Sequence, residues 1–236
     1  RKRIMANFVS THESASSSAV STLLKSVYMQ MAAALSITGL VAYFLSQSMD
    51  FWYFMSENPP LIWIILIAQI GVVVWLSARL NSMSISAATL LFILYSVLMG
   101  VTMTTIFMIY TAASIASTFF ITAGMFFVMS IVGFVTRIDL TRVGSILVMA
   151  LIGIIIASVV NIFLHSETLY WIISYAGVII FVGLTAYDTQ KIKGMIAEYG
   201  AVDEVGYKLA LLGALTLYLD FINLFLFLLR IFGNRK

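Results

Sequence analysis

The sequence predicts an all-α membrane protein with seven transmembrane helices, and two observations support this fold class. Hydrophobic residues make up 62% of the 236 residues and charged residues only 10%, whereas a soluble domain usually carries about 25% charged residues. The chain also contains apolar stretches of about 20 residues, the length that crosses a hydrocarbon core of roughly 30 Å as a helix. We therefore expect lipid to solvate much of the surface.

The apolar stretches follow one another with short polar connections between them. They predict spans at residues 26–47, 60–78, 86–109, 113–135, 143–164, 169–188 and 209–230. Pro59 and Pro60, the only two prolines, lie at the connection before the second span. The longest connection, residues 189–208, has mixed charge and is too short to form a domain. Function is therefore expected within the helix bundle or at its two ends.

The first 25 residues differ from the rest of the chain. They are basic and then serine-rich, with no signal-peptide core or cleavage pattern. The sequence therefore predicts a flexible cytosolic N-terminal tail at residues 1–25 and a seven-helix transmembrane domain at residues 26–236.

Lysine and arginine predict the orientation, because cytosolic loops carry an excess of both. With a cytosolic N-terminus, the three outer loops contain no lysine or arginine, and ten of the thirteen lie inside: Arg1, Lys2, Arg3, Lys25, Arg79, Arg137, Arg142, Lys191, Lys193 and Lys208. The remaining three, Arg230, Arg235 and Lys236, follow the last span and would lie outside. We predict a cytosolic N-terminus and an outer C-terminus.

Several kinds of chemistry are excluded or disfavoured by the residues present. The chain has no cysteine, which excludes disulfides, thiolate catalysis and cysteine-ligated metals. The spans contain neither a Gly-x-Ser-x-Gly elbow nor a His-Glu-x-x-His zinc motif. We therefore expect no enzyme, no cofactor and no nucleic-acid partner.

Asp220 stands in the middle of the last apolar stretch, where an aspartate costs about 2.5–3.5 kcal/mol on insertion scales. It shares one helix face with Gly213, Thr216 and Asn223, which recur at three- and four-residue intervals. This small and polar stripe is expected to face other helices. Asp220 is then either a protonated structural residue bonded to a neighbouring helix or part of a functional site.

A second acid, Asp188, ends the sixth predicted span. It is either a boundary carboxylate paired with Lys191 or Lys193, or the partner of Asp220, because consecutive spans tend to be neighbours. Two carboxyl groups in contact share a proton at low pH and repel one another when both are charged. Contact requires the sixth helix to continue past Asp188 toward Lys193, or the seventh to tilt.

Arg79 ends the second predicted span and is the basic residue nearest the membrane interior. It either anchors the helix by extending to water or bridges to one of the acids.

The segments around the two acids resemble a known family. "GLTAYDTQKIK" (183–193) and "ALTLYLDFINLFLFLLRIFG" (214–233) are similar to the paired signatures of the bacterial branch of the Bax inhibitor-1 (transmembrane Bax inhibitor motif) family. The resemblance implies six helices packed around a central seventh and a pH-sensitive cation leak, usually of calcium. It also implies a location in the inner (plasma) membrane of a bacterium. Asp188 and Asp220 match the acidic pair of the family.

The leading functional hypothesis is a pH-sensitive, calcium-permeable channel or leak gated by Asp188 and Asp220. Carboxylate oxygens are the ligands calcium prefers, and Thr216, Asn223 and Arg79 are candidate supporting residues. The partners would then be the lipid bilayer, calcium ions and protons. Two alternatives remain, a proton-coupled cation exchanger and a non-conducting regulator of membrane proteases or stress responses.

Overall fold

A computed structural model of the protein describes the backbone of residues 2–236 and the side chains of residues 18–236. Within this range the chain is helical, and the described residues form no β-sheet beyond an isolated bridge between Tyr110 and Arg235. The helices are α1 (Lys2–Ser46), α2 (Met49–Glu57), α3 (Pro60–Arg79), the 3-10 turn η1 (Leu80–Ser82), α4 (Ile85–Met103), α5 (Ile106–Ile109), α6 (Ala112–Val135), α7 (Thr141–Leu164), α8 (Glu167–Tyr199) and α9 (Glu204–Phe232).

Seven helical stretches within the described residues are long and apolar enough to cross a membrane. They are Ser18–Ser46, Pro60–Ser82, Ile85–Ile109, Ala112–Val135, Thr141–Leu164, Glu167–Tyr199 and Glu204–Phe232. The predicted all-α membrane class and the predicted number of spans are confirmed. The packing of six helices around the seventh stays a prediction.

The connection before the last span is much shorter than predicted. Helix α8 continues past Asp188 to Tyr199 and α9 begins at Glu204, so the predicted connection at 189–208 is wrong and only residues 200–203 join the two helices. Residues 189–199 are helical because they form an amphipathic continuation of α8. Ile192 and Ile196 are buried one turn apart, so an apolar stripe continues where the average hydropathy has already fallen.

The short connection is held by Asp203, which precedes α9. Its carboxylate accepts hydrogen bonds from the Gly206 N–H at 2.9 Å and from the Tyr199 hydroxyl at 2.6 Å, and the first of these lowers the pKa of Asp203 most. One turn further on, Glu204 and Lys208 form an ion pair at 3.0 Å. The bond from the Gly206 N–H satisfies one of the backbone donors that have no partner within the helix at the start of α9.

Three other boundaries differ from the sequence prediction. Helix α1 begins at Lys2, so residue 25 is not a break in the helix, and the division into a flexible tail and a membrane domain stays a prediction. The connection after the first span contains the short helix α2, which Ser48 caps by accepting a hydrogen bond from the Phe51 N–H. The third span is interrupted after Met103, where α4 ends and α5 follows.

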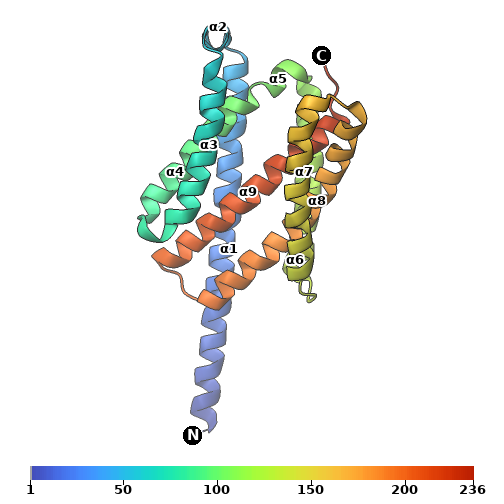
Figure 1. Ribbon diagram of the computed structural model, residues 1–236. Helices are drawn as coiled ribbons and strands as arrows, with labels where there is room; N and C mark the ends of the chain where they lie inside the picture. Colours follow the sequence, from blue (N-terminus) through green and yellow to red (C-terminus); the bar gives the residue numbers. More distant parts are fainter. Residues whose placement is uncertain (1) are drawn as a thin grey trace. The chain divides into compact units, whose positions relative to one another are not determined.

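The chain forms two compact units, Arg1–Thr104 with Lys191–Leu215, and Thr105–Gln190 with Thr216–Lys236. In the first unit α4 packs against both α1 and α3, and α3 and α4 run antiparallel (Figure 1). The Thr38 hydroxyl donates to the Ser96 carbonyl at 2.9 Å, and Gln69 donates to the Leu98 carbonyl at 2.7 Å. Such bonds satisfy polar groups that lipid cannot.

The second unit is built from α6, α7, the first part of α8 and the second part of α9. Its core contains Ile180, Phe181 and Leu184 of α8 and Leu224 and Leu228 of α9. Apolar side chains of α6 and α7 pack against this cluster, among them Met125, Leu147, Leu151 and Ile154.

In this unit α8 contacts both α6 and the connection that follows α6. Gly133 of α6 faces the backbone of Ala186, where a Cβ would meet the Ala186 carbonyl oxygen. Gln190 of α8 accepts a hydrogen bond from the Leu140 N–H and donates one to the Ile138 carbonyl, both at 2.9 Å. The connection between α6 and α7 is therefore tied to α8 close to Asp188.

Much of α7 is exposed and apolar. Large hydrophobic side chains stand free along it, including Ile146, Met149, Ile152, Ile156 and Phe163. A surface of this kind on a helix long enough to span a membrane is expected to contact lipid.

Candidate functional site

A cavity of about 540 Å³ lies within the second unit, bordered by α7, α8 and α9. Its polar lining comes from Asp188 of α8, Thr216, Asp220 and Asn223 of α9, and Ser158 of α7. The two aspartates are the only ionisable residues among those that line it. Sequence analysis singled out four of these five polar residues.

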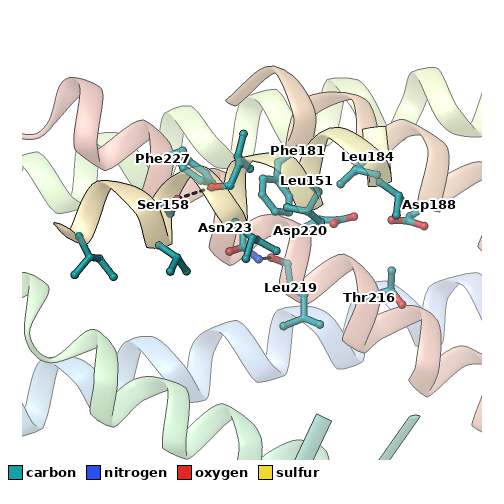
Figure 2. A pocket seen from close by; sticks show the side chains of 15 residues that line it. Leu151, Ser158, Phe181, Leu184, Asp188, Thr216, Leu219, Asp220, Asn223 and Phe227 are labelled. Atoms are coloured by element: carbon teal, nitrogen blue, oxygen red, sulfur yellow. Dashed lines mark hydrogen bonds between the residues drawn. The ribbon is translucent and has the colours of Figure 1, made fainter. Parts of the chain in front are cut away.

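Asp188 and Asp220 interact directly. The two carboxyl groups are close enough for each to act on the charge of the other, and Figure 2 shows them side by side at the cavity. The requirement that the sixth helix continue past Asp188 is met, because α8 extends to Tyr199. A hydrogen bond between two carboxyl groups needs a proton on one of them.

The environment of Asp220 is nearly closed to solvent. The residue is 5% exposed, and its Oδ2 is buried without a hydrogen-bond partner. A buried charge without a partner is costly. This oxygen is therefore a position where a proton or a cation would be stabilising.

The rest of the polar stripe on α9 separates into two parts. Thr216 and Asn223 border the cavity with Asp220, whereas Gly213 lies in the first unit and faces Ile192. The Asn223 amide donates to the Leu219 carbonyl of its own helix at 2.8 Å. That bond uses the NH₂ group, and the side-chain oxygen is the acceptor that remains for a cation.

Several residues around the cavity have no signal in the sequence. Ser158 of α7 is one polar residue among branched apolar ones, and its hydroxyl donates to the Ile154 carbonyl at 2.7 Å. The wall formed by Leu151 and Ile155 of α7 is likewise indistinguishable in sequence from the lipid-facing side of the same helix.

Arg79 is the last residue of α3 and is exposed. It belongs to the first unit, whereas both aspartates belong to the second. Its predicted role as an anchor or as a bridge to an acid stays a prediction.

The site provides two carboxylates but no complete metal-binding set. Among the residues that the structure describes, no group of three or more His, Asp or Glu side chains is placed to hold a metal ion. Calcium takes six to eight oxygen ligands, so most would have to come from Asn223, backbone carbonyls or water. Such a site suits brief occupation by an ion rather than permanent binding.

Comparisons with known proteins confirm the family that the sequence resembles. The family described as "Inhibitor of apoptosis-promoting Bax1" matches residues 20–236. The Inner membrane protein YbhL of Escherichia coli K12 is 50% identical over 216 residues, which cover 91% of this chain and 92% of that protein.

Two further relatives come from distant bacteria. An uncharacterised protein of Borreliella burgdorferi is 46% identical, covering 90% of this chain and 92% of its own length. One of Rickettsia prowazekii is 45% identical, covering 89% and 88%. With its seven apolar helices, the chain is an integral membrane protein that belongs to the Bax inhibitor-1 family.

Proposed function

We propose that the protein is a pH-sensitive, calcium-permeable leak of the membrane, gated by Asp188 and Asp220. The observation that carries this proposal is the directly interacting carboxyl pair at a cavity with no basic residue in its lining. In the closed state one proton is shared by the two carboxyl groups. That proton removes most of the cost of burying two charges between helices.

Loss of the shared proton would open the path. Two adjacent carboxylates repel one another, and the repulsion is strong where burial keeps water away. A cation entering the cavity would relieve it, because calcium prefers the hard oxygen atoms that carboxylates and Asn223 offer. The same pair would therefore sense pH and attract the ion.

The expected ion selectivity follows from these ligands. Purified full-length protein in liposomes that contain a calcium indicator should admit calcium, and lanthanide ions should block the entry, because they are hard cations of similar size. Equal permeability to chloride would contradict a site built from carboxylates.

The same preparation separates the leak from the two alternatives. An exchanger requires an opposing proton gradient, whereas a leak conducts calcium along its own gradient with the same pH on both sides. A regulator that does not conduct would give liposomes no more permeable than empty ones.

We propose the inner membrane of a bacterium as the location, because the E. coli relative is named an inner membrane protein. The distribution of lysine and arginine supports a cytosolic N-terminus and an outer C-terminus. A reporter joined to Lys236 by a flexible linker should then behave as external, and one in the connection at residues 200–203 as cytosolic. A cytosolic reporter at Lys236 would reverse this topology.

A further inference from the structure

A second cavity, of about 580 Å³, lies at the C-terminal end of α9 in the second unit. Its polar lining residues are Tyr110, Ser158, Asn161, Tyr170, Arg230 and Arg235. None of the residues that border it is acidic. The cavity therefore presents two permanent positive charges and several hydroxyl and amide groups.

Arg235 is held in place by the backbone around it. The Thr111 N–H donates to the Asn234 carbonyl at 3.1 Å and the Lys236 N–H donates to the Ile109 carbonyl at 2.9 Å, so the chain on both sides of Arg235 is bound to the segment before α6. The Asn234 N–H also donates to the Ser114 hydroxyl at 2.8 Å. These bonds fix the backbone on both sides of Arg235.

Both guanidinium groups contact Tyr170, one at its hydroxyl group and the other at its ring. Arg235 donates a hydrogen bond to the Tyr170 hydroxyl at 3.2 Å, and Arg230 lies over the Tyr170 ring at 5.7 Å from its centre. Arg230 also lies 5.2 Å from the centre of the Phe227 ring. Cation–π contacts hold the plane of a guanidinium group but leave its N–H donors available.

Neither arginine has a counter-ion of its own. Within the described part of the chain, no carboxylate forms an ion pair with Arg230 or Arg235. Two oriented guanidinium groups at a cavity that no acidic side chain lines can bind an anion. The planar fork of N–H donors on each group fits the oxygen atoms of a phosphate group best.

The surroundings point to the level of lipid headgroups. Trp171 and Tyr175 stack on one another near the start of α8, next to Tyr170, and Trp and Tyr gather where a membrane meets water. Ile109 and Ile162 border the same cavity and are exposed. An amphipathic ligand could place its phosphate against the arginines and its chain along these side chains.

We infer that Arg230 and Arg235 bind an anion that carries a phosphate group, at a site distinct from the aspartate pair. A phospholipid headgroup and free phosphate share this chemistry, and the aliphatic border of the cavity favours the lipid. The inference is independent of whether the protein conducts calcium, because it concerns binding alone.

The test uses the purified full chain in a neutral detergent and counts bound ligand by native mass spectrometry. The probes are a short-chain phosphatidylglycerol, a diacylglycerol with the same chains but no phosphate, and inorganic phosphate. We expect the wild type to bind the phosphatidylglycerol at least about tenfold more tightly than the diacylglycerol. If inorganic phosphate binds as tightly as the phosphatidylglycerol, the anion site is supported and its ligand is the soluble anion.

Two double variants make the test specific. R230Q/R235Q should lose this preference. R137Q/R142Q should keep it, because it removes the same charge from two exposed arginines elsewhere, one in the connection before α7 and one in the first turn of α7. If R230Q/R235Q does not fold, R230K/R235K retains both charges but not the planar fork, and we expect it to bind with reduced preference. An equal loss in R137Q/R142Q, full binding by R230K/R235K, or no preference in the wild type would overturn the inference.

Discussion

Replacing Asp220 with asparagine is expected to lower calcium flux by about tenfold or more. The substitution preserves the size of the side chain but removes the most deeply buried charge at the cavity. Attraction between two unit charges 4 Å apart is about 4 kcal/mol at an effective dielectric constant of about 20. Every 1.4 kcal/mol corresponds to about tenfold, so losing even part of this attraction suppresses the passage of a divalent ion.

Asp188→Asn is expected to weaken the pH response of the flux while the flux itself persists, which separates pH sensing from attraction of the cation. Flux in the wild type should rise with pH between about pH 6 and about pH 8, because loss of the shared proton leaves two charges that repel. In D188N no repulsion can develop, so flux should persist with a flattened pH response. The double variant should add little to D220N if the two acids act as one unit.

The matched control for both variants is Asp139→Asn. Asp139 is an exposed aspartate of the same unit, two residues before α7, and its carboxylate accepts a hydrogen bond from the Thr141 N–H at 2.9 Å. The side-chain oxygen of asparagine can accept the same hydrogen bond, so D139N should conduct like the wild type. Wild-type pH profiles in D188N and D220N would return both acids to structural roles.

Gly133→Ala is expected to lower stability by about 1–3 kcal/mol. The new Cβ would meet the Ala186 carbonyl oxygen and lie 2.9 Å from its Cα, and backbone atoms cannot rotate out of the way. The two helices must therefore separate, which removes contacts that only small residues allow. For a chain of this size each kcal/mol corresponds to about 2–4 °C in melting temperature, which thermal unfolding in detergent can measure.

Gly153→Ala provides the control, since Gly153 is exposed on α7 and a Cβ there would meet nothing within 4 Å. Alanine favours a helix over glycine by about 1 kcal/mol, so this variant should be as stable as the wild type or more so. Equal melting temperatures for G133A and G153A would show that the close approach of α6 to α8 contributes nothing.

The sequence carried enough information to predict the membrane fold and to single out the two acids as candidates for a pair. Asp188 and Asp220 were recognisable because charged residues in apolar helices are costly and need a reason. The connection at 189–208 was mispredicted because Ile192 and Ile196 maintain a buried stripe that an average over polar neighbours hides.

Other parts of the molecule could not be predicted because they depend on distant contacts. Nothing local distinguishes Ser158 from a lipid-facing position of α7. The site at Arg230 and Arg235 needs Tyr170 from another helix and a backbone bridge to Tyr110, and neither is visible in the order of residues. In the sequence, Arg230, Arg235 and Lys236 were noticeable only as an exception to the expected excess of basic residues in cytosolic loops.

The backbone bridge at the C-terminus also limits how α9 can move. Residues 234–236 are bonded to residues 109–114, so sliding of α9 along its axis would break the hydrogen bonds just beyond Phe232. The helix can still bend or swing about that bonded end, and the displacement then grows with distance from it. A swing that parts Asp220 from Asp188 would move Asn223 less and Thr216 more. The distance of Asp220 from the bonded end of α9 therefore determines how far its carboxyl group moves for a given swing.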